Sequence, residues 1–214
     1  MATHRAQFAK AIEAHAADFG IELADEQAKL LADYYELLLK WNERLHLVAP
    51  CSPEDFAVRH VLESLMLLRH LPRGANVVDV GSGGGLPIIP CLLVRRDLHA
   101  TLIESSKRKT VFLREALRGV KPTDRPRVIN SRFEEIDFPP GDFLTCRALD
   151  KFSELLNTLI QRTRPNTTML LFAGDALRRQ IQSLIPSVTA ERIPHSQKRF
   201  LIIATSVPPA VVGG

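Results

Sequence analysis

Four glycines stand within five residues near the middle of the chain, immediately after the apolar run VVDV. They are Gly81, Gly83, Gly84 and Gly85, with Ser82 between the first two and Leu86 after the last. Glycines at this density let a ligand lie against bare backbone without a clash with a Cβ atom. The stretch lacks the Lys-Ser or Lys-Thr pair of a phosphate-binding P-loop, and its G-x-G-x-G pattern differs from the G-x-G-x-x-G of dinucleotide sites. It predicts a tight turn that holds either another nucleotide-like ligand or none.

Acidic side chains flank this stretch at two points along the chain. Asp79 lies two residues before Gly81, and Glu104 ends the next apolar run, about twenty residues on, where nucleotide-binding sheets carry a ribose-binding acid. Asp79 can hold a cationic amino group, directly or through water, and would repel the phosphates of a dinucleotide. The combination resembles the S-adenosylmethionine-dependent methyltransferases, whose cofactor carries a ribose, a sulfonium and an amino-acid end but no pyrophosphate.

Such residues need a sheet to bring them together, and the hydrophobic pattern predicts one. From Asn76 onward, apolar runs of strand length alternate with runs of helical period. The predicted strands are 77–80, 99–104, 126–136, 142–148 and 167–174, with helices over 86–94, 107–120, 153–162 and 176–185 and a closing antiparallel hairpin over 188–194 and 199–207. In the helix over 107–120, the expected inward side chains are Val111, Phe112, Ala116 and Val120. The fold class is therefore α/β, with a mostly parallel, twisted, doubly wound sheet.

Residues 1–71 differ from the rest because they are helical in pattern throughout. Asp25 is the expected N-cap of a helix whose apolar side chains recur every three or four residues, from Leu30 to Leu45. A second helix is predicted over AVRHVLESLMLLRHL. The expected organisation is an N-terminal helical extension over 1–71, an α/β core over 72–206 and a frayed tail over 207–214.

Composition excludes several classes of protein. The chain has 214 residues, of which 45% are hydrophobic, and no run approaches the ~18 apolar residues that a membrane span needs. The N-terminal segment lacks the apolar core of a signal peptide, and the three cysteines are far apart, without a C-x-x-C pair. We expect a cytoplasmic protein with no membrane association, no metal site and a monomeric state.

Several segments together resemble one family closely. LKWNERLHL, AVRHVLESL, DVGSGGGLPIIP, ESSKRKTVFLREAL, SRFEEI and CRALDKFSELL are similar, in order and spacing, to segments of the RsmG (GidB) family. The resemblance extends from about Leu23 to Ala204 and is firmest from Trp41 to Arg147. It implies a Rossmann-like class I methyltransferase that uses S-adenosylmethionine to methylate N7 of a guanine in bacterial 16S ribosomal RNA.

The resemblance also implies roles for individual residues. Those expected to line the methionine and ribose part of the cofactor are Asp79, Gly81, Ser82, Gly83, Gly85 and Leu86. Glu104 and Ser105 are expected to hold the ribose, and Phe133 and Glu134 to flank the adenine. Arg147 is expected where cofactor and substrate meet. Arg59 and His60, on a polar face with Glu63 and Ser64, would position the substrate with Arg147; spacing alone favours a solvated helix face for them.

The implied chemistry requires no general base. N7 of guanine exposes an in-plane lone pair on the base edge, and its methylation releases no proton. We therefore expect catalysis by proximity and orientation. Cys146 offers a contrary hypothesis, because a cysteine near a strand end beside Arg147 can be a nucleophile; a small buried residue is the favoured interpretation.

Three positions depart from the family pattern. Ile88 replaces a glycine, Cys146 a serine and Ala173 a lysine. The missing lysine removes a positive charge and leaves two alternatives open, namely a methyltransferase with a different substrate and a non-catalytic cofactor-binding RNA or assembly factor.

A polyanionic partner such as 16S RNA or the small ribosomal subunit is compatible with the charge. Lys and Arg outnumber Asp and Glu by 28 to 24, which gives a net charge of +4. The basic residues form three groups along the sequence, which are Lys107, Arg108, Lys109 and Arg114, then Arg125, Arg127, Arg132 and Arg147, and finally Arg178, Arg179, Lys198 and Arg199.

Overall fold

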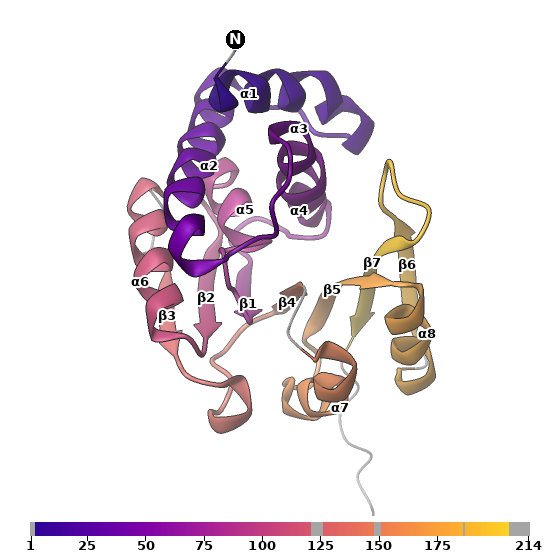
Figure 1. Cartoon of the computed structure of the whole chain (residues 1–214). Coiled ribbons are helices and arrows are strands. Elements are labelled where there is room, and N and C mark those ends of the chain that lie inside the picture. The colour runs from indigo at the N-terminus through magenta and orange to yellow at the C-terminus, as the bar shows by residue number, and fades with distance from the viewer. Residues whose placement is uncertain (1–2, 121–125, 148–150, 186, 206–214) are drawn as a thin grey trace, which may run out of the picture.

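The sheet at the centre of the molecule has the predicted α/β topology. The computed structural model describes residues 3–120, 126–147, 151–185 and 187–205 (Figure 1), so the tail over 207–214 and Arg125 lie outside the described residues. Within these ranges the strands form one seven-stranded sheet of order β3-β2-β1-β4-β5-β7-β6. Among the described strands, only β7 runs in the direction opposite to the others, so the predicted mostly parallel sheet with a closing antiparallel hairpin is confirmed.

The strand order defines where a ligand can bind. The strands are β1 (Asn76–Val80), β2 (His99–Glu104), β3 (Arg127–Asn130), β4 (Phe143–Arg147), β5 (Thr168–Gly174), β6 (Val188–Arg192) and β7 (Arg199–Thr205). After β1 the chain moves outward through β2 and β3, then returns to the other side of β1 for β4 and β5. This reversal creates a crevice at the carboxyl ends of β1 and β4, where doubly wound sheets bind ligands.

Helices cover both faces of the sheet. Neighbouring residues of a strand point to opposite faces, so strands that are apolar throughout need cover on both sides. Val77 packs in the hydrophobic cluster that includes α5 (Ile88–Val94) and α6 (Lys107–Ala116), whereas Val78 and Val80 pack in the cluster that includes α7 (Phe152–Arg162) and α8 (Asp175–Leu184). The crevice therefore lies on a sheet that is buried on both faces.

The N-terminal helices add a further layer over α5 and α6 (Figure 1). They are α1 (His4–His15), the 3₁₀ turn η1 (Ala16–Phe19), α2 (Asp25–Leu45), α3 (Pro53–Phe56), the π-helix η2 (Ala57–Leu62), α4 (Glu63–Leu65) and the 3₁₀ turn η3 (Met66–Arg69). Their buried side chains, among them Phe8 stacked on Tyr35, belong to the same cluster as Val77. Because the two parts share one core, the division at residues 71 and 72 stays a prediction about sequence organisation.

Two local predictions were wrong. Ala24, not Asp25, occupies the N-cap position of α2, where the Gln27 side chain accepts a hydrogen bond of 2.8 Å from the Ala24 N–H. Val111 is 49% exposed, because the buried stripe of α6 follows Phe112, Leu113 and Ala116 and leaves Val111 on the solvent side. Within the described ranges, no helix has the length and apolar character needed to cross a membrane.

Candidate active site

The glycine stretch forms the loop between β1 and α5, and its backbone requires glycine. Gly81, Gly83 and Gly85 have φ angles of 69°, 52° and 82°, in the left-handed region that side chains disfavour. A Cβ atom on Gly85 would also lie 2.3 Å from Cδ1 of Ile89 in the first turn of α5. The loop can therefore pack tightly on α5 while its other side stays bare toward the crevice.

Glu104 fixes this loop to the end of β2. Its side-chain oxygens accept hydrogen bonds from the Gly83 N–H at 2.8 Å and from the Ser106 N–H at 2.7 Å. Ser106 is the N-cap of α6, so one carboxylate connects the glycine loop with the start of the next helix. Glu104 is only 6% exposed, yet it lines the crevice. A carboxylate offers about four lone-pair positions, so the two backbone bonds leave room for ligand hydroxyl groups.

Asp79 lies deeper than Glu104. Its side chain is fully buried, and its Oδ1 accepts a hydrogen bond of 2.6 Å from the Thr145 hydroxyl on β4. Its Oδ2 has no hydrogen-bond partner among the described residues. Burial raises the pKa of Asp79 to about 7. Because Asp79 lines neither cavity described below, its contact with a cationic amino group stays a prediction.

Tyr34 supports the loop from the N-terminal helices, a role that the sequence analysis missed. Its hydroxyl donates a hydrogen bond of 2.5 Å to the Gly84 carbonyl, and burial raises its pKa. The helical period of α2 marked Tyr34 only as an apolar position. The available signal was chemical, since a buried tyrosine hydroxyl nearly always has a partner.

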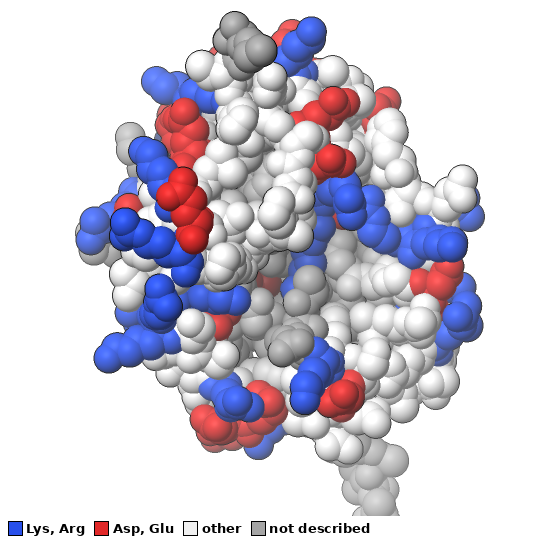
Figure 2. Space-filling model, viewed as in Figure 1, with Lys and Arg blue, Asp and Glu red and all other residues white. Residues whose placement is uncertain are grey.

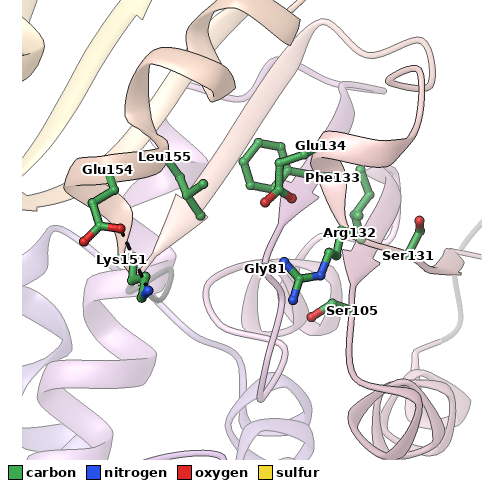
Figure 3. Close-up of a pocket in the computed structure, with 10 residues that line it drawn as sticks. Gly81, Ser105, Ser131, Arg132, Phe133, Glu134, Lys151, Glu154 and Leu155 are labelled. Atoms are coloured by element: carbon green, nitrogen blue, oxygen red, sulfur yellow. Dashed lines mark ion pairs between the residues drawn. The ribbon is translucent and has the colours of Figure 1, made fainter.

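Two adjoining cavities occupy the carboxyl ends of the strands, and Figure 2 shows the surface hollowed near the centre of this face. The first cavity, of about 490 Å³, is lined by Ser82, Gly83, Leu86, Glu104, His60 and Arg147, among others. The second, of about 560 Å³, is lined by Phe133, Glu134, Arg132, Lys151 and Leu155, among others (Figure 3). Gly81 and Ser105 line both, so the two cavities form one cleft around the glycine loop.

Figure 3 shows how the second cavity is walled. Phe133 and Glu134 stand on one side and Leu155, Glu154 and Lys151 on the other, with Gly81 between them. The Phe133 ring is buried and packs on Phe138, with 6.2 Å between the ring centroids. An apolar wall beside a carboxylate suits a flat heteroaromatic ring with an amino group, which is the role predicted for Phe133 and Glu134.

A buried ion network forms the wall of the first cavity. The Glu63 carboxylate, 1% exposed, lies 3.1 Å from Nη2 of Arg147 and also pairs with Arg199 at the start of β7. Nη2 of Arg147 donates to the backbone carbonyl of Arg59 as well, and its guanidinium lies 5.1 Å from the centroid of the Phe172 ring. A buried carboxylate between two guanidinium groups has its charge compensated, so this network holds Arg147 in one orientation.

His60 and Arg59 lie on the π-helix η2, a conformation that often marks functional sites. His60 lines the first cavity, and burial, assisted by the charges of Arg147, Arg59 and Arg199, lowers its pKa to about 3. Its imidazole is therefore neutral at physiological pH. Arg59 is exposed and contributes its carbonyl to Arg147, while its side chain lines neither cavity. The solvated helix face, which spacing alone favours, is wrong for Glu63, which is buried.

Comparisons with known proteins identify the family of the chain. The family model described as GidB, rRNA small subunit methyltransferase G, matches residues 27–203. The chain belongs to this family. A relative named Ribosomal RNA small subunit methyltransferase G from Xanthomonas campestris pv. campestris (strain B100) is 37% identical over 162 residues, which are 75% of each chain. One of the same name from Neisseria meningitidis serogroup B is 30% identical over 182 residues, which are 85% of this chain and 87% of the relative.

Solved structures of low sequence identity share the fold of this GidB family member. The O-methyltransferase from Bacillus cereus in complex with SAH has a TM-score of 0.54 at 16% identity, covering 81% of this chain and 90% of that one. Cofactor-bound Rv0187 from MTB has a TM-score of 0.58 at 14% identity, covering 84% and 91%. Likeness at this identity concerns architecture, and it confirms the predicted Rossmann-like class.

The three departures from the GidB family pattern all lie in the hydrophobic core. Ile88, Cys146 and Ala173 are 0%, 0% and 5% exposed, and none of them lines either cavity. Cys146 is buried in the cluster on the α7 and α8 face. A nucleophile must reach its substrate, so this burial favours the packing role of Cys146 over catalysis.

Proposed function

We propose that the protein transfers a methyl group from S-adenosylmethionine to N7 of a guanine in bacterial 16S ribosomal RNA, in the cytoplasm, on free RNA or on the small subunit. The observation that carries the proposal is the single cleft around the glycine loop, with Glu104 at its centre and the Phe133 wall at one end. Family membership supplies the class of substrate.

The residues present fit the cofactor. The bare backbone at Gly81 and Gly83 admits a close approach, and the Glu104 carboxylate keeps lone pairs for two ribose hydroxyl groups. Ser105 lies beside it, and Phe133 and Glu134 would flank the adenine. Oδ2 of Asp79 has no hydrogen-bond partner among the described residues, and Asp79 is predicted to hold the cationic amino end, directly or through water. When bound, S-adenosylmethionine supplies an electrophilic methyl group on a sulfonium.

The side chains of the first cavity would position the guanine rather than move a proton. A neutral His60 with a pKa of about 3 is a weak base, which suits a reaction that releases no proton. Arg147, held by Glu63 and the Arg59 carbonyl, lies where cofactor and base would meet. Catalysis would then depend on aligning the N7 lone pair with the methyl group, through proximity and orientation.

Cations around the cleft would contact the RNA backbone. Lys109 lines the first cavity, and Arg132 and Lys151 line the second. Figure 2 shows Lys and Arg side chains on both sides of the hollow. Such groups neutralise phosphates without reading sequence, so they would orient a folded RNA over the cleft.

Methyl transfer from radiolabelled S-adenosylmethionine tests the proposal. We expect label in unmodified 16S RNA or small subunits, recovered as N7-methylguanosine when the RNA is digested to nucleosides. Glu104→Ala should abolish most incorporation and weaken cofactor binding, whereas the exposed control Glu135→Ala should do neither. Label in another nucleoside or only in protein, or cofactor binding with no transfer to any RNA form, would refute it.

A further inference from the structure

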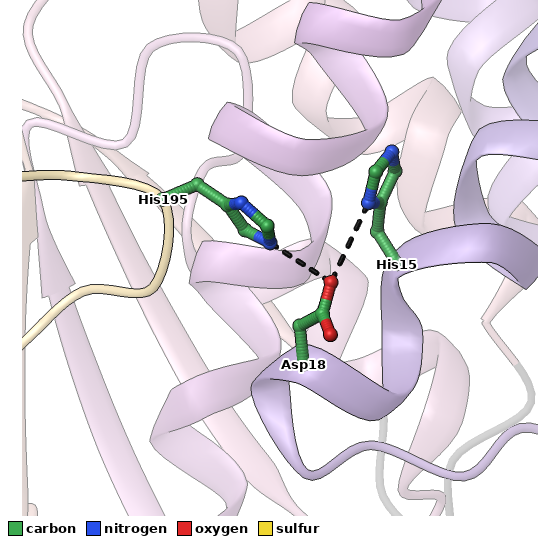
Figure 4. Close-up of side chains that lie close together, drawn as sticks. All are labelled: His15, Asp18 and His195. Atoms are coloured by element: carbon green, nitrogen blue, oxygen red, sulfur yellow. Dashed lines mark hydrogen bonds and ion pairs between the residues drawn. The ribbon is translucent and has the colours of Figure 1, made fainter.

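Three side chains far apart in the sequence meet at the junction between the N-terminal helices and the closing hairpin (Figure 4). His15 ends α1, Asp18 lies in η1, and His195 lies in the loop between β6 and β7. Oδ2 of Asp18 is 2.9 Å from Nε2 of His195 and 3.5 Å from Nδ1 of His15. One potential ligand atom from each of the three residues lies within 4.8 Å of the other two.

Two of the three separations between donor atoms match the donor spacing of a zinc site. Zinc binds imidazole nitrogen and carboxylate oxygen at about 2.0–2.1 Å in tetrahedral geometry, which separates neighbouring donor atoms by roughly 3.3 Å. The two separations above, 2.9 and 3.5 Å, bracket that value. Two histidines and one carboxylate also form a donor set that zinc commonly takes, with water in the fourth position.

The surroundings of His15 add a second, independent observation. Its Nε2 lies 3.3 Å from Oε1 of Glu54, in α3. A histidine that binds a metal usually donates its other ring N–H to a carboxylate, which fixes the tautomer. If Nε2 of His15 carries the hydrogen for Glu54, its Nδ1 presents a lone pair toward the Asp18 carboxylate. Two acceptors face each other there, and a cation between them would remove the repulsion.

We infer that His15, Asp18 and His195 bind one Zn²⁺, with Glu54 as the hydrogen-bond acceptor that orients His15. The three side chains are 28%, 49% and 46% exposed, so an ion and a coordinated water can reach them. Asp18 and His195 are 177 residues apart in the sequence. Bound zinc would therefore fasten the hairpin loop to the N-terminal helices and stabilise the folded chain through mass action. Because Asp18 and His195 are so far apart in the sequence, no short motif of metal ligands predicted this site.

Titration of the full chain with ZnCl₂ alone, followed by calorimetry at pH 7.5, tests the inference. The protein should carry no affinity tag, should be stripped with a chelator, and should contain Cys51→Ser throughout, because Cys51 is an exposed thiol. We expect one equivalent to bind. His195→Gln and Asp18→Asn should each weaken zinc binding at least tenfold. Glu54→Gln should weaken it about tenfold, because a carboxylate that orients a metal-binding histidine contributes to metal affinity. His4→Gln, on α1 outside the cluster, should bind zinc like the parent.

Two further readouts do not depend on heat of binding. Co²⁺ in place of zinc should give the intense visible absorption of a tetrahedral site in the parent, and lose that absorption in His195→Gln. Zinc should also raise the Tm of the parent and leave that of His195→Gln unchanged. Failure to bind one saturating equivalent, or equal affinity in the parent and in folded His195→Gln, would overturn the inference. Hydrogen bonds alone would then hold the three side chains together.

Discussion

Two buried carboxylates on neighbouring strands differ in their surroundings. Glu104 accepts hydrogen bonds from two backbone N–H groups. Asp79 has one hydroxyl donor to its side chain and one bare oxygen, so its burial is poorly compensated. The charge of Asp79 therefore costs folding free energy, which makes this residue the clearest source of pH dependence in the cleft.

Asp79→Asn should stabilise the protein in a pH-dependent way. The folded-state pKa of about 7 lies above the ordinary 3.8, so the contribution of Asp79 to wild-type stability falls as pH rises from about 4 to 7. The variant cannot ionise, so its free energy of unfolding relative to wild type should rise over that range by about 2–4 kcal/mol and then level off. Urea unfolding at intervals between pH 4 and 8 measures this difference.

The exposed substitution Glu135→Gln controls for the loss of one carboxylate at the surface. A constant difference between Asp79→Asn and wild type across the same pH range would contradict the account of Asp79. Reduced cofactor affinity in the more stable variant would identify its buried charge as a functional requirement.

The sequence analysis identified several of the residues that line the cleft but not the way they are held. Glu104, His60 and Arg147 were all predicted. Arg199, however, was only one member of a basic group, and its pairing with Glu63 requires that β7 reach the wall of the cleft. Sequence spacing contains no information about such a contact between distant segments, and it equally concealed the burial of Glu63.

At the scale of elements, the loop between β1 and α5 is held from three sides. Glu104 contacts it from β2, Tyr34 contacts it from α2, and Gly85 packs on Ile89 of α5. The mostly parallel sheet, the closing hairpin and the glycine turn follow from periodicity and turn residues, and they were predicted correctly. Periodicity alone did not identify the buried side of each helix, which depends on tertiary contacts. Trp41 of α2 packs on Phe112, with 6.0 Å between ring centroids, and this contact selects the buried side of α6.

Gly85→Ala should disrupt the loop. The new Cβ would meet Cδ1 of Ile89 at 2.3 Å, and the φ angle of 82° disfavours any side chain. We expect a loss of about 2–4 kcal/mol in the free energy of unfolding, with weaker cofactor binding. Gly119→Ala is the matched control, because its Cβ would meet nothing within 4 Å and should change stability by less than about 0.5 kcal/mol. Equal effects of the two substitutions would argue against a strained loop.

Tyr34→Phe removes the hydrogen bond between α2 and the loop while it keeps the ring. The Gly84 carbonyl then loses its buried donor, so stability should fall by about 1–3 kcal/mol and calorimetric affinity for S-adenosylmethionine should fall with it. Tyr35→Phe provides the comparison, since the Tyr35 ring keeps its stacking on Phe8. Unchanged cofactor affinity in Tyr34→Phe would show that the loop does not need this support.

At the scale of the whole molecule, the positions of the cationic side chains matter more for RNA binding than the net charge of +4. Cations line both cavities of the cleft, whereas other basic side chains are occupied elsewhere, such as Arg5, which pairs with Asp33 and Glu36. RNA affinity should therefore depend on a few positions around the cleft.

Lys109→Ala should weaken RNA binding in a salt-dependent manner. Each phosphate contact contributes about 0.7–0.9 to the slope of log affinity against log salt concentration, so the slope should become shallower by about that amount. Filter binding of 16S RNA at several salt concentrations measures it. Lys10→Ala, on α1 and lining neither cavity, should leave the slope unchanged. A slope that responds equally to both substitutions would place the RNA elsewhere on the surface.

The pairing of Glu63 with both Arg147 and Arg199 joins an early, a middle and a late segment of the chain. Because synthesis proceeds from the N-terminus, Glu63 leaves the ribosome long before the strand that begins at Arg199. Until that strand pairs with β5, the Glu63 carboxylate lacks one of its two guanidinium partners. We therefore expect the wall of the cleft to be complete only once the closing strand is in place.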